Sequence, residues 1–170
     1  MVLCKKTLMK IFKRKYDESD YTPNGIDLRL KDVELCLDSA DFEYGFDADG
    51  NKILPSTVQW LPDEDGFYHF EPNKRYLWNL GKNSYPGVIG LFFLRSTIMR
   101  GGGKLYSSVA DLGYDGTIIV GFESATRLKI PKNERVVQCI FLELDDDSGE
   151  KYHGDYQGDK IYKQKTFEGE

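Results

Sequence analysis

Two short stretches of the sequence concentrate residue types that can handle phosphate. The first runs from Arg95 to Arg100 and offers these two guanidinium groups together with the hydroxyls of Ser96 and Thr97. Arginine presents forked donors that match phosphate oxygens, and hydroxyls with turn N–H groups complete such a cradle. The stretch therefore predicts a phosphate-binding loop after a buried strand, although a solvated loop would have the same composition. The following glycines, 101–103, do not form a P-loop because no Gly-Lys-Ser/Thr is present.

The second stretch, Asp111-Leu-Gly-Tyr-Asp-Gly116, places a carboxylate at the entry to a tight turn and an aromatic ring at Tyr114. A carboxylate in that position could hold an attacking water molecule. An ordinary Asx turn would show the same spacing. Both interpretations stay open at this point.

Two further polar residues are candidates for the same site. Asp27, in Gly25-Ile-Asp-Leu-Arg29, could face a metal-bound triphosphate or could simply be a turn residue that starts a strand. Gln138 is flanked by apolar strand residues, and a buried amide must bond either to neighbouring backbone or to a ligand. His69 and His153 are isolated, and we expect no catalytic role for them.

The elements that would position these residues are mostly strands. From Gly25 onward, short apolar runs alternate with Gly, Pro, Asn and Asp turns, which is typical of an all-β sandwich or barrel. Two runs, Val88 to Leu94 and Val136 to Leu142, are almost continuously apolar and are predicted to be covered on both faces. Asp49-Gly50 predicts a hairpin. Strands are predicted at 26–30, 33–37, 42–46, 52–54, 67–70, 76–80, 88–94, 105–109, 117–122, 127–130 and 136–144.

The two ends of the chain differ from this pattern. Apolar residues recur near helical spacing between Leu3 and Tyr16, which predicts one amphipathic helix. Its apolar face is modest, so packing on the domain edge is favoured over membrane-surface binding. After Leu144 an acidic run interrupts the pattern, and the remaining residues have too little apolar content to fold alone. We therefore predict one domain, 1–144, with a tail at 145–170.

Composition limits the possible partners and location. The chain has 170 residues with Lys+Arg 23 against Asp+Glu 28, a formal net charge of -5, which argues against broad binding to nucleic acid or to a membrane. Three cysteines without CxxC spacing predict neither a zinc site nor a disulfide framework. The start of the chain is too short and lysine-rich for a signal peptide, and no apolar run could span a membrane. A cytoplasmic protein is expected.

Taken together, the motifs resemble the dUTPase and dCTP deaminase superfamily, most closely the archaeal-type dUTPases. The resemblance extends from about Asn24 to Asp159. Its five motifs occur in order: Gly25-Ile-Asp-Leu-Arg29, Arg95-Ser-Thr-Ile-Met-Arg100, Asp111-x-Gly-Tyr-x-Gly116, Arg135-x-x-Gln138 and Tyr152-His-Gly-Asp-Tyr-Gln-Gly158. Each motif alone is a weak signal, but the ordered set is a strong one.

The resemblance implies a mainly β fold, a distorted β-barrel or jelly-roll, that assembles as a homotrimer with active sites between subunits. It also implies Mg²⁺-assisted attack of water on the α-phosphorus of dUTP, giving dUMP and pyrophosphate. Such a reaction keeps uracil out of DNA and supplies dUMP for dTMP synthesis. These chemical steps need positioning and charge neutralisation more than covalent help.

The resemblance also assigns roles by position. Asp111 would orient the water, and Tyr114 would lie under the deoxyribose and exclude a 2′-hydroxyl. Asp27 would sit near the magnesium waters. The backbone of Ile119, Val120 and Gly121 would recognise uracil. Five residues would hold the phosphates: Arg95, Ser96, Thr97, Arg100 and Gln138. Three tail residues would close over the nucleotide: Tyr152, Tyr156 and Gln157.

Some positions depart from the family pattern. Gly121 stands where the deaminases carry a catalytic Glu, although Glu123 faces the same side of the strand and a register shift could bring it into place. Asp155 and Asp159 replace the Lys and Gln of a deaminase-type tail. We therefore expect a dUTP diphosphatase, with a dCTP deaminase, mono- or bifunctional, and a non-catalytic nucleotide-binding module as the alternatives.

Overall fold

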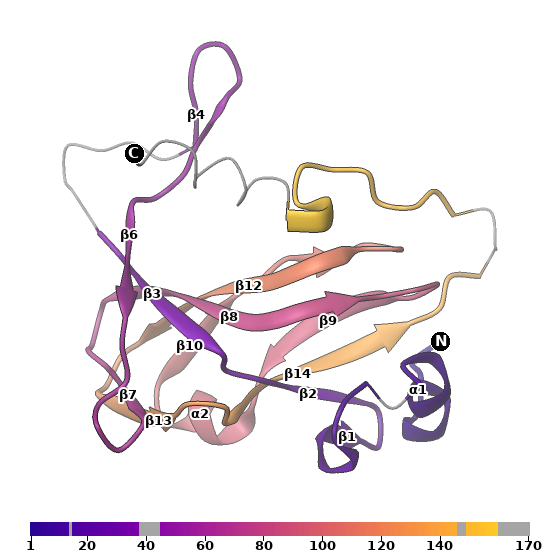
Figure 1. The fold of residues 1–170 in the computed structure, drawn as a ribbon, viewed down its shortest axis with the longest axis horizontal. Helices are drawn as coiled ribbons and strands as arrows, with labels where there is room; N and C mark the ends of the chain where they lie inside the picture. Colours follow the sequence, from indigo (N-terminus) through magenta and orange to yellow (C-terminus); the bar gives the residue numbers. More distant parts are fainter. Residues whose placement is uncertain (14, 38–44, 146–148, 160–170) are drawn as a thin grey trace.

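The protein consists mainly of β-strands arranged in two large sheets (Figure 1). Its computed structural model describes residues 1–13, 15–37, 45–145 and 149–159. The first sheet has the strand order β1-β2-β14-β9-β11. Its strands are β1 (Tyr21–Thr22), β2 (Gly25–Arg29), β14 (Arg135–Leu142), β9 (Ile89–Leu94) and β11 (Val109–Ala110).

The second sheet has the order β10-β12-β8-β3-β6, and two hairpins complete the fold. Its strands are β10 (Gly103–Tyr106), β12 (Asp115–Ser124), β8 (Arg75–Ser84), β3 (Asp32–Cys36) and β6 (Thr57–Trp60). The hairpin strands are β4 (Gly45–Phe46) with β5 (Lys52–Ile53), and β7 (Phe67–Phe70) with β13 (Leu128–Pro131).

The core lies between the inner faces of the two sheets. Along β12 every second residue is buried, which is the period of a strand with one face inward. Trp78 and Phe122, on neighbouring strands, stack with ring centroids 3.8 Å apart. Opposite them, Phe92 and Phe141 of the first sheet are also buried, and Phe141 contacts Phe12 at the N-terminal edge.

Most predicted strands are confirmed, with several corrections. Strand β6 was not predicted, and the predicted strand at 105–109 divides into β10 and β11 on different sheets. The Asp49-Gly50 hairpin forms, but residues 47–51 connect its strands, because the Asp47 carboxylate accepts the backbone N–H groups of Asp49 and Asn51. Of the predicted strand 42–46, residues 42–44 lie outside the described residues, as do tail residues 146–148 and 160–170.

The helices are shorter than predicted or were missed. The N-terminal helix is confirmed as α1 (Lys5–Ile11), and it buries Leu8 on the domain edge. Arg95 to Arg100, predicted to be a loop, instead forms the one-turn helix α2 (Ser96–Arg100). Two 3₁₀ turns, η1 (Glu18–Asp20) and η2 (Gln157–Asp159), complete the described elements. Among the described strands the two large sheets stay open rather than closing into a barrel.

The outer face of the first sheet is unusually apolar. Alternation along β9 directs Ile89, Leu91 and Phe93 outward, and Phe93 is 49% exposed. On the neighbouring strand, Val109 is 46% exposed. In this single chain the outer face is therefore uncovered at these positions, whereas the sequence predicted cover on both faces of β9 and β14.

Candidate functional site

The phosphate motif, Arg95 to Arg100, directly follows the end of strand β9. The backbone N–H of Arg95 donates to the carbonyl of Val136 at 3.0 Å, so Arg95 still belongs to the sheet ladder when the chain turns into α2. Ile98 anchors the underside of this helix by its burial. A Cβ at Gly103 would lie 2.9 Å from the Phe122 ring and 3.0 Å from the carbonyl of Ile98, so only glycine permits this close return of the chain.

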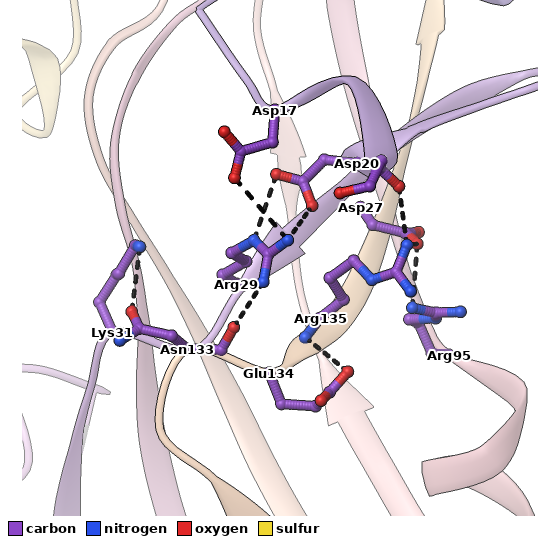
Figure 2. A network of polar contacts seen from close by, with 10 residues as sticks. Asp17, Asp20, Asp27, Arg29, Lys31, Arg95, Asn133, Glu134 and Arg135 are labelled. Carbon is purple, nitrogen blue, oxygen red and sulfur yellow. Dashed lines mark hydrogen bonds and ion pairs between the residues drawn. The ribbon is translucent and has the colours of Figure 1, made fainter.

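Asp27 is the buried acidic centre of this region (Figure 2). Its side chain is 4% exposed, and its carboxylate lies 3.0 Å from Arg95 Nη1 and 3.8 Å from Arg135 Nη1. Burial raises the pKa of Asp27, while Arg95 and then Arg135 act in the opposite direction. The structure therefore brings together the first, second and fourth sequence motifs around one carboxylate.

A second ion pair, between Arg29 and Asp20, lies beside the first. Arg29 donates to the two carboxylate oxygens of Asp20 at 3.2 Å and 2.6 Å, which is the bidentate geometry that suits a guanidinium (Figure 2). The hydrogen bond that Arg29 donates to Asp20 is the main cause that raises the pKa of Arg29. Arg135 also donates to the carbonyl of Ser19 at 2.7 Å. These contacts connect β2 and β14 to the turn η1.

Gln138 lies on β14 between β2 and β9. Its register partners are Asp27 on one side and Phe93 on the other. Its Nε2 donates to Thr22 Oγ1 at 2.7 Å. The side-chain amide is thus satisfied by a hydroxyl rather than by the neighbouring backbone, and its carbonyl oxygen stays available on the same face as Asp27. We call Asp27, Arg95, Ser96, Thr97, Arg100 and Gln138 the phosphate half-site.

A cavity of about 630 Å³ lies against β12. Six residues predicted from the sequence line it: Asp111, Tyr114, Ile119, Val120, Tyr152 and Tyr156. The sequence analysis missed the rest of the wall, namely Leu54, Pro55, Leu77, Phe92, Ser108, Val109, Ala110, Thr117 and Ile118. The missed residues are mainly apolar and carry no motif. We call this cavity, with Asp111 and Tyr114, the nucleoside half-site.

The turn that carries Asp111 is held by backbone bonds. Tyr114 N–H donates to the Asp111 carbonyl at 3.0 Å, and Gly113 adopts a φ of 74°, which glycine tolerates without strain. Within the described part of the chain, the Asp111 carboxylate has no hydrogen-bond partner, so the alternative of an Asx turn is not formed. Tyr114 is largely buried, and its hydroxyl donates to the carbonyl of Thr117 at 2.8 Å.

The strand behind the cavity is irregular. The pairing of β12 with β8 shifts register between Thr117 and Ile119, which pair with Lys82 and Asn79 respectively. Such a bulge disturbs the ladder locally and redirects backbone groups. Here the bulge coincides with the cavity wall. Backbone donors and acceptors that would otherwise be used by the sheet are therefore placed where a ligand could meet them.

The C-terminal segment runs past β12, and its turn η2 lies beside that strand (Figure 1). Gln157 does not line the cavity; its side chain accepts from Asp115 N–H at 3.0 Å and donates to the Gly113 carbonyl at 3.1 Å. Asp159 accepts from Thr117 N–H at 2.6 Å. The tail therefore closes on the turn of its own chain, and Gln157 fixes that turn.

The deaminase position does not hold a carboxylate. Gly121 pairs with Tyr106 on β10, and a Cβ at Gly121 would lie 3.1 Å from the Tyr106 Cβ. Glu123 accepts a hydrogen bond from the Tyr106 hydroxyl at 2.8 Å, which raises the pKa of Tyr106. Neither Gly121 nor Glu123 lines the cavity. Glu123 thus already has a hydrogen-bond partner in Tyr106 and lies outside the cavity lining.

Asp111 and Arg95 lie far apart within one chain. Asp111 follows Ala110, which pairs with Gly90 near the start of β9, whereas Arg95 follows the end of that strand. Arg95 is five positions beyond Gly90 in the sequence. At about 3.3 Å per strand residue, this separation is about 17 Å.

The described residues offer neither a cluster of metal ligands nor a helix that could span a membrane. No group of three or more His, Cys, Asp or Glu residues in this part of the chain could hold a metal ion. The described helices include none long and apolar enough to cross a membrane.

Comparisons with known proteins agree with these features. A probable deoxyuridine 5'-triphosphate nucleotidohydrolase from Methanopyrus kandleri is 33% identical over 82% of this chain and 89% of its own length. A protein with the same name from Methanococcoides burtonii is 29% identical over 85% of each chain.

One solved structure is similar to this chain in fold. The dCTP deaminase from Agrobacterium tumefaciens matches with a TM-score of 0.61 and 14% sequence identity, covering 82% of this chain and 47% of that chain. The profile of the dCTP deaminase-like family matches residues 4–144. The chain therefore belongs to the dCTP deaminase-like family.

Proposed function

We propose that the protein hydrolyses dUTP to dUMP and pyrophosphate. One observation carries this proposal: the Asp111 carboxylate has no hydrogen-bond partner among the described residues and lines the cavity beside Tyr114. A free carboxylate at a nucleotide cavity can accept a proton from water and orient it. The archaeal relatives, named probable dUTP nucleotidohydrolases, support the same substrate.

The cavity accounts for recognition of a deoxynucleoside. The Tyr114 ring is fixed by its hydroxyl bond to Thr117, so it forms a rigid floor under the sugar and leaves no space for a 2′-hydroxyl. Uracil would meet the backbone of Ile119 and Val120, next to the register shift of β12. Because recognition uses backbone groups, it depends on the shape of the strand rather than on a charged side chain.

A complete site would need two copies of the chain. Within one chain about 17 Å separates Asp111 from Arg95 along β9, whereas groups acting on one phosphorus must lie within hydrogen-bond reach or one water of it. The apolar outer face of β9 borders the phosphate half-site, since Phe93 pairs with Gln138. A second copy that covers this face would bring its own Asp111 to the first copy's arginines, and a homotrimer with three such interfaces satisfies every copy.

The chemistry follows from this arrangement. Asp111 of one copy holds the attacking water. Arg95, Arg100, Ser96, Thr97 and Gln138 of the neighbouring copy hold the triphosphate and neutralise charge that develops on its oxygens. The tail tyrosines, Tyr152 and Tyr156, exclude bulk water from the nucleoside.

The phosphate half-site fits a magnesium ion that arrives with the substrate. Mg²⁺ typically keeps several waters and uses one or two carboxylates together with substrate phosphates, so a protein cage is not needed. Asp27 is the carboxylate at this half-site; it is paired with Arg95 and would reach the ion through water. When bound, Mg²⁺ supplies charge neutralisation on the triphosphate.

A single assay tests the proposal and its alternatives. Purified protein with Mg²⁺ should release pyrophosphate from dUTP and no ammonia from dCTP, and chelation with EDTA should stop the release. Ammonia from dCTP would favour deamination, which the fold of the Agrobacterium enzyme keeps as the second candidate. Tight dUTP binding without pyrophosphate would indicate a non-catalytic nucleotide-binding module.

A further inference from the structure

The hairpin of β4 and β5 reaches the C-terminal tail through one lysine. Lys52 Nζ lies 2.5 Å from Asp155 Oδ2 and 4.8 Å from the centroid of the Tyr156 ring. Asp155 and Tyr156 are consecutive tail residues, so one ammonium group engages both. Figure 1 shows this hairpin projecting from the body of the fold, away from the phosphate half-site.

The same part of the chain also forms a wall of the cavity. Leu54 and Pro55 follow β5 directly and line the nucleoside half-site opposite β12. Tyr156 lines the cavity too. Its backbone carbonyl lies close to Gly116, since a Cβ built on Gly116 would lie 3.1 Å from the carbonyl oxygen of Tyr156. Tyr156 is therefore held between β12 on one side and Lys52 on the other.

The tail has anchors of two kinds. Gln157 and Asp159 bond to backbone groups of the 113–117 turn, which fixes the end of the described tail. Toward the cavity, Lys52 provides an ion pair and a cation–π contact that act on the orientation of Tyr156. Asp155 raises the pKa of Lys52, chiefly through their hydrogen bond. Exposed ion pairs contribute little to stability individually. The Lys52–Asp155 pair matters because it orients the aromatic ring of Tyr156.

We propose that Lys52 is a positioning residue that holds Tyr156 over the nucleoside half-site by clamping Asp155 and the tyrosine ring. This inference deepens the proposed function and rests on it, since the clamp serves nucleotide binding. It assigns a role to a hairpin that contributes no catalytic group. It also gives Asp155, unsuited to phosphate, a cationic partner within its own chain.

The test uses the full-length protein and measures both binding and tail motion. Lys52→Ala should raise the KM for dUTP about 3- to 10-fold, the effect of losing one or two weak contacts, and leave kcat within about twofold. Without nucleotide, backbone amides of 149–159 should exchange hydrogen faster in this variant. Lys52→Arg keeps both contacts and should restore both readouts.

Two comparisons make the test specific. Lys74→Ala removes an exposed lysine outside the cavity and should change neither KM nor exchange. Lys52→Asp and Asp155→Lys should each raise KM, and the double charge swap should lower it again. Unchanged exchange in Lys52→Ala, or a KM equal to that of Lys74→Ala, would overturn the clamp.

Failure of the clamp and failure of the proposed function can be told apart. Because the exchange measurement needs no nucleotide, it decides whether Lys52 holds the tail even if wild-type protein released no pyrophosphate. A fall in kcat at constant KM would place Lys52 in the chemistry and would also contradict a positioning role.

Discussion

The two half-sites are built on opposite principles. In the phosphate half-site the central polar groups already have partners: Asp27 with Arg95 and Arg135, and Gln138 with Thr22. In the nucleoside half-site the Asp111 carboxylate has none among the described residues, and the walls are mainly apolar. Under the proposed function, a preorganised set of cations would face charge that is always present on the ligand, whereas the free carboxylate would hold the water that reacts.

The difference also appears in how each half-site is held. Two sheet strands and a buried ion pair fix the phosphate half-site. A turn, a bulge and the tail shape the nucleoside half-site, and its Asp111 carboxylate has no hydrogen-bond partner among the described residues. Removing Arg95 should therefore cost stability as well as activity, whereas removing the Asp111 carboxylate should cost activity with little loss of stability.

The largest effect is expected at Asp111. Asp111→Asn removes the base for the attacking water and should lower kcat at least about 10³-fold while dUTP binding stays within a few-fold. Asp115→Asn, in the same turn, is the matched control and should keep near-normal turnover. Steady-state kinetics and calorimetric dUTP binding measure the two effects. A normal kcat in Asp111→Asn would remove the nucleoside half-site from the chemistry.

Replacing each of two arginines of the phosphate half-site, Arg95 and Arg100, should lower activity, but only the Arg95 variant should also lose stability. Arg95→Ala leaves Asp27 with a weaker partner and should lower the free energy of unfolding by roughly 2–3 kcal/mol as well as activity. Arg100→Ala, on the exposed side of α2, should lower activity with little loss of stability. Urea unfolding and pyrophosphate release measure this contrast. Equal stability losses would mean that the Asp27–Arg95 pair is not the structural centre.

Specificity should depend on the ring of Tyr114. Tyr114→Ala opens space beside the sugar, so the preference for dUTP over UTP should fall by about 10-fold or more. Tyr114→Phe keeps the ring and loses the hydroxyl that donates to Thr117, so it should retain most of the preference. The ratio of kcat/KM for the two nucleotides is the readout. Unchanged discrimination in Tyr114→Ala would contradict the position assigned to the sugar.

The smallest effect is a pH dependence from Asp27. Burial raises its pKa in the folded protein, so the folded state holds the proton more tightly than the unfolded chain does. The resulting contribution to the free energy of unfolding is fully present below the pKa of Asp27 in the unfolded chain, near about 3.9. It is lost as pH rises through the pKa of Asp27 in the folded protein. Wild type should therefore lose stability relative to Asp27→Asn as pH rises above about 4. Urea unfolding of both proteins across this range measures the difference; an opposite slope would mean that Arg95 and Arg135 outweigh burial.

Much of this architecture could be predicted from the sequence because its signals are local. Alternation and turn residues predicted most strands, and the order of the motifs indicated the family. The helix α2 was missed because its five residues are too few to show helical periodicity. Strand β6 was missed because its half-exposed residues, such as Val58 and Gln59, lack a clear apolar pattern.

The site could be predicted only in part for a similar reason. Motif residues were found, but which of them share a surface depends on strand pairing across the whole chain. Leu54 and Pro55 follow a hairpin that was predicted, but neither residue belongs to a motif that would place it at the cavity. Lys52 and Asp155 are far apart in sequence, so only the folded chain reveals their contact.

The central claim is that one active site uses two copies of the chain, and mixing two inactive variants tests it most directly. Asp111→Asn damages one half-site, and the double variant Ser96→Ala/Arg100→Ala damages the other without touching the Asp27–Arg95 pair. If sites form between neighbouring copies, random reassembly of an equal mixture should restore about one quarter of the wild-type pyrophosphate release. No recovery from fully mixed oligomers would contradict a shared site.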